Sequence, residues 1–250
     1  MTFVTHPLTV FIKYKVIFTK HPDLFKIIIS LGFFSFSTAA LTDNNQQLTD
    51  VACHYETTIT PDNKSTAPST TTWFFWRKAN IIQTQDESGR YGEIWEKTAT
   101  GNIQYRKFYP ADKTAVEYMP ADSTTHNLVF NWNKLSNMLS QQELDALKPV
   151  ENKQVLGRNA ELRTGKINEQ TIEVLWLPTE QLPASIIRKD KTGMVALKLI
   201  EITPLSAAPK KPIDSETIAN YRQIDAADFG DMENDPFVKK LMSVEGHHVD

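Results

Sequence analysis

The stretch Thr171–Ile202 constrains the fold more than any other, because it reads as three consecutive strands separated by two turns. In the first of them Ile172, Val174 and Trp176 alternate with other side chains and therefore share one face. The segment Lys189–Gly193 has the length and the glycine of a short hairpin loop, with Gly193 expected at a positive φ. The three expected strands are Thr171–Leu177, Pro183–Arg188 and Met194–Ile202. The pattern predicts an antiparallel meander with one buried face.

Similar strands, separated by turn signals, precede this meander. A helix-compatible insert at 133–149 interrupts them, with Ser140 as N-cap of its second half and Pro149 as its stop. The other expected strands are Val51–Thr60, Thr71–Lys78, Ile81–Asp86, Glu93–Lys97, Asn102–Tyr109, Thr114–Met119 and Gln154–Thr164. We therefore expect an α+β, mainly β fold: one curved antiparallel sheet, an unclosed half-barrel, with a few helices covering one face.

The N-terminal segment 1–40 has the features of a secretory signal peptide. Four lysines precede the apolar run Ile27–Phe36, and small residues follow it, which predicts cleavage near Ala39 or Ala40. The run is shorter than the roughly 20 apolar residues that a membrane-spanning helix needs, although a retained N-terminal anchor is the alternative. The chain is thus expected to be exported to the periplasm.

The rest of the chain divides by composition. Segment 41–203 contains the strands and the helical insert, and 204–250 begins with a proline-rich connector and ends in an acidic extension. Within that extension we expect a short helix from Asp214-Ser215, an edge strand at Tyr221–Ile224 and a final helix at Pro236–Met242.

Composition limits the classes of function. The 250 residues include 27 Lys and Arg against 30 Asp and Glu, a net charge of -3, which does not indicate a nucleic-acid partner. Cys53 is the only cysteine, so an intramolecular disulfide is impossible. A lipid-modified Cys53 is the alternative to a packed one, but Asp50 close before it does not suit that modification. We expect Cys53 to pack within the first strand.

The most unusual motif is Trp73-Phe74-Phe75-Trp76, which makes both faces of one strand aromatic. Such a strand is typical of the centre of a sheet that is covered on both sides. The alternative is an apolar concave face that binds a lipid or an acyl chain. The candidate ligand-binding residues are Trp73, Phe74, Phe75, Trp76, Trp95, Tyr105, Phe108 and Trp176.

No motif with catalytic or metal-binding spacing stands out. The run from Asp225 to Asp235 holds five carboxylates in eleven residues, but its spacing and the position of Gly230 do not match a calcium loop. The pair His247-His248 is typical of an unstructured tail. Nucleophile-elbow, phosphate-loop and dinucleotide fingerprints are missing from the sequence. We therefore expect no catalytic residue, no cofactor and no metal, and a protein that is not an enzyme.

One family resemblance can be added to these observations. The elements Leu175-Trp176-Leu177-Pro178, Leu182-Pro183, Asp190 and Gly193 occur in an order that resembles the periplasmic lipoprotein-carrier (LolA/LolB-like) superfamily. The resemblance covers Val51–Ile202 and implies an unclosed barrel with a helical lid and an apolar cavity for acyl chains. None of the family's functional residues, its cavity arginine included, can be placed on this sequence.

Two functions from different classes follow as hypotheses. The first is an exported, non-enzymatic protein that binds or carries a lipophilic ligand, an acyl chain or lipoprotein-like cargo, with transient contact with a membrane. The second is an envelope scaffold that docks a protein partner through the acidic extension.

Overall fold

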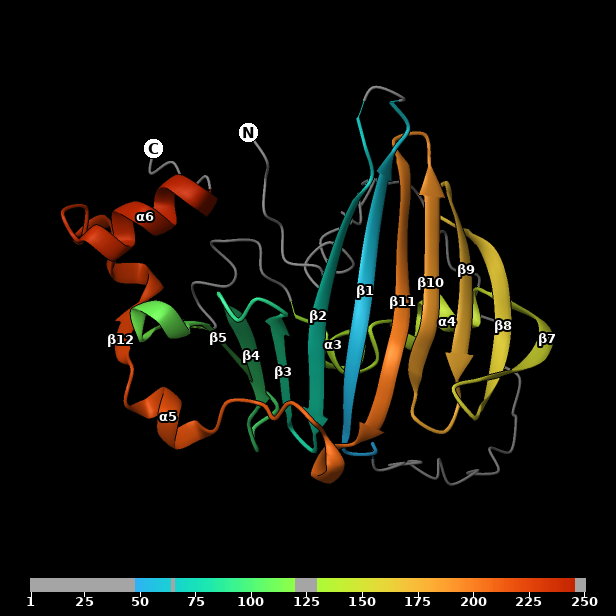
Figure 1. Ribbon diagram of the computed structural model, residues 1–250, viewed down its shortest axis with the longest axis horizontal. Coiled ribbons are helices and arrows are strands. Elements are labelled where there is room, and N and C mark those ends of the chain that lie inside the picture. The colour runs from blue at the N-terminus through green and yellow to red at the C-terminus, as the bar shows by residue number, and fades with distance from the viewer. Residues whose placement is uncertain (1–47, 64–65, 120–129, 246–250) are drawn as a thin grey trace, which may run out of the picture.

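The computed structural model describes residues 48–63, 66–119 and 130–245 (Figure 1). The predicted signal peptide, with its cleavage site at Ala39 or Ala40, lies outside the described residues, and so does the pair His247-His248. Among the helices in the described ranges, none is both long and apolar enough to cross a membrane.

The described residues form one twelve-stranded sheet that is curved and not closed, which confirms the expected fold class (Figure 1). Its order is β12-β6-β5-β4-β3-β2-β1-β11-β10-β9-β8-β7. The strands of the first half are β1 (Val51–Pro61), β2 (Ser69–Lys78), β3 (Ile81–Asp86), β4 (Gly92–Lys97), β5 (Ile103–Tyr109) and β6 (Thr114–Tyr118). Those of the second half are β7 (Lys148–Val155), β8 (Arg158–Ile167), β9 (Gln170–Leu177), β10 (Leu182–Asp190), β11 (Gly193–Pro204) and β12 (Arg222–Asp225).

The meander predicted from Thr171–Ile202 is confirmed as strands β9, β10 and β11, which are neighbours and antiparallel. Ile172, Val174 and Trp176 are all buried on one face. Gly193 pairs with Asp190 at the hairpin and has a φ of 141°, as expected for its turn. Strand β1 pairs with β2 on one side and with β11 on the other, and it thereby joins two meanders into one sheet.

The region after the helical insert differs from the prediction. Instead of one strand over Gln154–Thr164 there is a hairpin of β7 and β8, which turns at Leu156-Gly157. Both turn residues have positive φ, 49° and 72°, as a tight two-residue hairpin turn requires. Pro149, predicted to stop a helix, lies inside β7, where the sheet edge tolerates its missing N–H.

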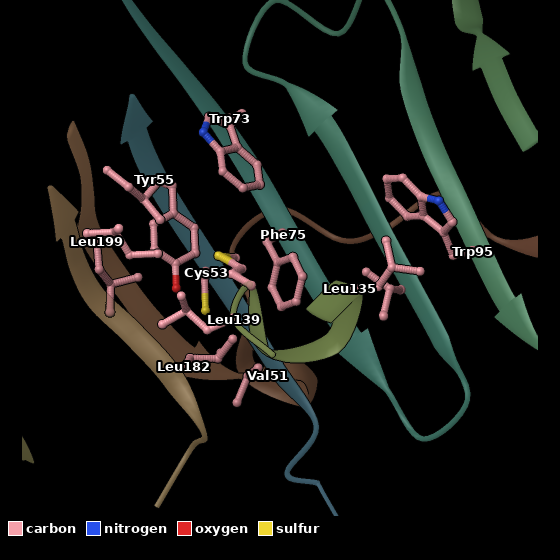
Figure 2. Packing of buried hydrophobic residues seen from close by; sticks show 14 of the residues in the cluster. Val51, Cys53, Tyr55, Trp73, Phe75, Trp95, Leu135, Leu139, Leu182 and Leu199 are labelled. Atoms are coloured by element: carbon pink, nitrogen blue, oxygen red, sulfur yellow. The ribbon is translucent and has the colours of Figure 1, made fainter. Parts of the chain in front are cut away.

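The short helices α3 (Trp132–Asn137) and α4 (Gln141–Asp145) lie against one face of the sheet, here called the inner face. Ser140 caps α4 as predicted, since its side chain accepts from the Glu143 N–H while the Glu143 carboxylate accepts from the Ser140 N–H. Figure 2 shows Leu135 and Leu139 from this region beside Phe75, Cys53 and Tyr55 of the sheet. The largest buried cluster among the described residues includes this interface.

The opposite, outer face is crossed by the strap, residues 205–214, which follows β11 and leads to α5 (Ser215–Ala219; Figure 1). The Trp76 Nε1–H donates to the Lys210 carbonyl at 2.9 Å, and the Lys210 ammonium lies 4.3 Å from the Phe74 ring centroid. The Gln83 amide donates to the Ile213 carbonyl at 2.7 Å and accepts from its N–H at 3.0 Å. These bonds hold the strap on the sheet.

A close approach on the outer face requires glycine at position 92. A Cβ there would lie 2.3 Å from Cζ of Phe108 and 2.5 Å from the Thr84 carbonyl oxygen. Phe108 packs over Gly92 with Ile94 and with Ile218 of α5. The absent side chain therefore makes room for the aromatic ring that anchors α5.

The C-terminal segment extends the sheet rather than leaving it. Strand β12 pairs with β6 in parallel, while all other pairs are antiparallel, and it confirms the predicted edge strand. Helices α5 and α6 (Pro236–Glu245) confirm the two predicted helices. The buried side chains of Ile224, Phe229, Val238 and Leu241 join the main core cluster. Part of 204–250 is thus integral to the core of the fold.

Candidate functional site

The candidate site is the part of the inner face that lies beneath α3 and α4, which together with the turns that follow them (residues 132–147) we call the helical cover. Five side chains of the cover are buried against the sheet: Leu135, Met138, Leu139, Leu144 and Leu147. Gly165 of β8 lets the end of the cover come close, because a Cβ there would lie 2.9 Å from Cδ2 of Leu147. The cover and the sheet therefore enclose an apolar interface.

The aromatic residues predicted to bind a ligand divide between the two faces. Five lie in the cluster on the inner face: Trp73, Phe75, Trp95, Tyr105 and Trp176. The other three, Phe74, Trp76 and Phe108, pack in separate clusters on the outer face. Phe108 cannot line one pocket with Tyr105, because residues three apart in a strand point to opposite sides. Five of the eight candidate residues therefore share the inner face, and a ligand-binding role for them stays a prediction.

The inner-face aromatic rings are stacked in two groups. The Tyr55 and Trp73 ring centroids are 5.2 Å apart, and the Tyr55 hydroxyl donates to the Pro183 carbonyl at 2.9 Å. Tyr105 stacks on Trp95 at 5.4 Å, and its hydroxyl donates to the buried Glu93 carboxylate. The interface thus consists of stacked aromatic rings with a few fixed polar groups.

Arg77 of β2 is the most unusual polar residue of this face, because its side chain is 0% exposed. Its Nη1 donates to the Ser136 carbonyl at 2.8 Å and to Asn137 Oδ1 at 3.3 Å, both in the helical cover. The guanidinium also donates to the carbonyls of Thr49 and Glu180. Burial lowers the pKa of Arg77 from its usual value. One side chain therefore connects the sheet to the end of α3.

A second arginine connects the sheet to α4. Arg188 of β10 is 5% exposed, and its Nη2 lies 3.3 Å from Oε1 of Glu143, which also accepts from the Lys134 ammonium at 3.0 Å. Burial alone would raise the pKa of Glu143, but the charges of Lys134 and Arg188 and the Ser140 N–H outweigh it and lower that pKa. Arg163 of β8 adds a long hydrogen bond, 3.4 Å, to the Leu144 carbonyl.

Cys53 lies under the same cover, next to Tyr55 and Arg77, and it is buried and free, as expected from the sequence. Burial raises the pKa of its thiol to about 12, so the group is neutral and unreactive in the folded chain. Its side chain packs in the main core cluster.

The acidic run is partly used by local structure. The Asp225 carboxylate accepts from the Ala227 N–H, and the Asp235 carboxylate accepts from two N–H groups of α6 and pairs with Arg222 at 2.7 Å. A shallow cleft of about 380 Å³ lies beside this pair and is also lined by Phe237 and Lys240. Within the described residues, no group of three or more His, Cys, Asp or Glu side chains is arranged to hold a metal ion.

Arg77 and Arg188 were not predicted as site residues from the sequence. A signal was available in the alternation of β2, because Arg77 follows Trp73 and Phe75 at the same inward register. An arginine on the buried face of an aromatic strand indicates a partner elsewhere in the fold. The partner itself was not readable, since it belongs to the cover, about 60 residues away.

Comparisons with known proteins find only distant structural matches. No protein-family model matches the sequence, and no curated protein matches it significantly. Among solved structures, PNGF-II matches with 14% identity and a TM-score of 0.40, over 74% of this chain and 33% of that one. MucB of Pseudomonas aeruginosa, in complex with MucA, matches with 10% identity and a TM-score of 0.37, over 69% of this chain and 56% of that one.

A LolA superfamily protein from Nitrosomonas europaea is also among the matches. It has 10% identity and a TM-score of 0.26, with 68% of this chain and 89% of that chain covered. The chain spans about a third of the length of PNGF-II and little more than half of MucB. At these identities and TM-scores, the function has to be argued from the residues of the chain itself.

Proposed function

We propose that this chain is an exported, non-enzymatic protein that binds or carries a lipophilic ligand, an acyl chain or lipoprotein-like cargo, on the inner face beneath the helical cover. The observation that carries the proposal is the way the cover is attached. Apolar side chains of the cover lie on an aromatic sheet face, and arginines of the sheet hold it by hydrogen bonds to its carbonyls and side chains.

The cover has little stability of its own. Helix α3 has six residues and α4 has five, whereas isolated helices shorter than about 12 residues are marginal in water. Its position therefore depends on the contacts with the sheet. The apolar contacts between the cover and the sheet are not directional. The acyl chain of a lipid can therefore take the place of the cover's side chains at little cost in free energy.

The polar part of the attachment is releasable. Each hydrogen bond to a charged group contributes about 1.5–3 kcal/mol to the stability of the closed form. When the cover lifts, water can replace the partner in each of these bonds. Arg77 and Arg188 hold the cover at two separate points, one at the end of α3 and one at α4. Such an attachment keeps the apolar face closed when it is empty and opens it to a ligand that supplies new contacts.

Localisation is part of the proposal. The predicted signal peptide directs the chain out of the cytoplasm, and a fold without disulfides that packs its single cysteine suits either redox environment. Transient contact with a membrane would deliver or remove the ligand.

Native mass spectrometry with lipid extraction tests this function. The full chain is expressed with its own N-terminal segment, purified without detergent, and compared with Leu139→Asn in the cover and Leu156→Asn at the exposed β7–β8 turn. We expect a lipid in the wild type and in the Leu156 variant, and less in the Leu139 variant, because Leu139 is 2% exposed and Leu156 is 46% exposed. A wild-type protein that carries no lipid and takes up no fatty acid would contradict the proposal.

An envelope scaffold that docks a protein partner is the second candidate. Its support is the exposure of three carboxylates in the acidic run, Asp228, Asp231 and Glu233. Deleting 204–250 would not test it, because β12 and buried side chains would be lost as well. The triple change to Asn, Asn and Gln alters exposed side chains only, so we expect the fold to be kept. If the scaffold hypothesis holds, the change should abolish co-purification of a partner. Unchanged co-purification would remove the support.

A further inference from the structure

Strand β7 forms an open edge of the sheet. It is the last strand of the order, so among the described residues it has a neighbouring strand only on the side of β8 (Figure 1). It has eight residues, seven of them exposed, whereas β12 at the opposite edge has four. A long exposed edge offers unpaired N–H and C=O groups to another strand, which a very short edge strand does not. Of the two edges, β7 is therefore the one suited to pairing with another chain.

Exposed apolar side chains lie at the same edge. Val150 of β7 is 59% exposed, and Leu156 of the β7–β8 turn is 46% exposed. They are two of the four large hydrophobic side chains that the described residues leave exposed. A strand added beside β7 would remove part of this apolar surface from water, which favours the addition.

The hairpin determines which backbone groups of β7 face the free edge. Val155 and Arg158 flank the two-residue turn and form a hydrogen-bonded pair, and the two kinds of pair alternate from there. Gln154 and Asn159 are then a pair of the other kind, in which side chains lie closer, and the Gln154 amide donates to Oδ1 of Asn159. The N–H and C=O groups of Gln154, and those of Asn152 two residues before it, consequently point away from β8.

We propose that this edge binds a second copy of the chain, with the two β7 strands antiparallel about a two-fold axis at Asn152. The order of charges along the strand identifies the occupant. Glu151 and Lys153 flank Asn152, are about half exposed, and pair with each other at 2.7 Å. With Asn152 opposite Asn152 of the second copy, Glu151 of each copy faces Lys153 of the other. Opposite charges directly across two strands stabilise their pairing.

The charges also select this register over its neighbours. Backbone groups that point outward must meet groups that point outward, so the allowed registers differ by two residues. A shift by two in one direction places Glu151 against Glu151 of the second copy, and a shift in the other direction places Lys153 against Lys153. Like charges directly opposite destabilise a sheet. Only the axis at Asn152 combines matched backbone groups with opposite charges at both neighbouring positions.

The start of β7 limits the extent of the pairing. Pro149 lacks an N–H, and the register with β8 shifts between Pro149 and Glu151, two features that restrict pairing at sheet edges. The interface is therefore short, and we expect a weak, reversible dimer. A two-fold axis uses the same strand in both copies, so the association closes at two chains. It does not involve β12 and α6, which lie at the other end of the sheet (Figure 1).

The oligomeric state of the full chain tests the proposed dimer. The chain is expressed with its own N-terminal segment, purified without detergent, and measured by analytical ultracentrifugation from micromolar to submillimolar concentrations. The wild type is compared with Glu151→Lys, with Lys153→Glu, and with the double exchange of both. The control is Glu173→Lys, because Glu173 is exposed on the interior strand β9 and the net charge changes as in Glu151→Lys. Circular dichroism establishes that the variants are folded.

We expect a monomer–dimer equilibrium in the wild type and in Glu173→Lys. Each single change at 151 or 153 places two like-charged pairs across the axis and should weaken dimerisation about 10-fold or more. The double exchange restores opposite charges and should return the affinity close to that of the wild type. A wild type that stays monomeric throughout would overturn the proposal. So would a dimer that the single changes do not weaken, or one that the double exchange does not restore.

A cysteine at the axis tests the register independently of charge. Asn152→Cys places two thiols opposite each other, at a Cα separation of about 5.5 Å that a disulfide can span. Cys53 is buried and does not compete. With oxidised glutathione we expect a disulfide-linked dimer of Asn152→Cys on a non-reducing gel, and a monomer of the control Glu173→Cys. Equal cross-linking of the two variants, or none in either, would contradict the axis at Asn152.

Discussion

The attachment of α4 to the sheet can be tested through the charge of Glu143. Glu143→Gln keeps the size and one acceptor oxygen of the side chain and removes the charge that faces Lys134 at 3.0 Å and Arg188 at 3.3 Å. Arg188 is 5% exposed and would lose its counter-ion inside the protein. Hydrogen bonds to charged groups contribute about 1.5–3 kcal/mol each, but Lys134 retains contact with water. We expect a loss of about 2 kcal/mol in the free energy of unfolding at neutral pH.

The effect should depend on pH in a defined direction. The pKa of Glu143 in the folded chain lies below its ordinary value of 4.5. A carboxylate whose pKa is lower in the folded than in the unfolded chain stabilises the fold at pH values above its unfolded-state pKa. This stabilisation is lost as the pH falls through the folded-state pKa. Once protonated, Glu143 resembles glutamine. The difference between wild type and variant should therefore be full at pH 7 and shrink as the pH falls below 4.5 towards the depressed pKa.

Urea unfolding followed by tryptophan fluorescence, at neutral pH and at several acidic values, measures both effects. The matched control is Glu151→Gln, because Glu151 pairs with Lys153 on the exposed edge strand β7 and is 52% exposed. A surface pair of this kind is expected to change stability by less than about 1 kcal/mol. A loss at Glu143 that is the same at pH 7 and at acidic pH, or no larger than that of the control, would refute the charge-based attachment.

Three further predictions concern other parts of the fold. Gly92→Ala should reduce the free energy of unfolding in urea by about 1–3 kcal/mol, because the new Cβ would overlap the Phe108 ring that packs on Gly92. The control Gly230→Ala has open space around the new Cβ and should leave that free energy unchanged. Equal effects of the two changes would contradict the packing argument. Gln83→Ala removes both hydrogen bonds to Ile213, so it should lower the free energy of unfolding by about 1–3 kcal/mol and speed proteolysis of the strap. An unchanged cleavage rate would show that other contacts hold the strap. The Cys53 thiol, with its pKa raised to about 12, should resist iodoacetamide in the folded chain and react with it in urea. Mass spectrometry follows the labelling. A folded chain that is labelled as fast as a free thiol would disprove the burial of Cys53.

Much of the sheet was readable from local patterns. The alternation of Ile172, Val174 and Trp176 predicted both a strand and its buried side, and Ser140 predicted where α4 begins. The hairpin at Leu156-Gly157 was missed because β7 is an exposed edge strand, so it lacks the alternation that marks a half-buried strand. Patterns of burial identify strands only where there is a face to bury.

The candidate site was predictable only in part. The sequence placed Trp73 and Phe75 on one side of their strand and Phe74 and Trp76 on the other, and the structure agrees. It could not determine on which side Phe108 would lie relative to them, because that depends on how β5 is aligned with β4. It also gave no partner for Arg77.

The sequence by itself determined most of the strands, where most of them turn, and which side chains of one strand share a face, since these follow from repeats of two or a few residues. Only the tertiary structure decided that β1 joins the two meanders, that β12 runs parallel to β6, and that α3 and α4 cover the aromatic face. The physical reason is the distance along the sequence over which each feature is decided. A strand's alternation is local, but its neighbours and the acceptors of a buried guanidinium are selected by the packing of segments that lie far apart along the chain.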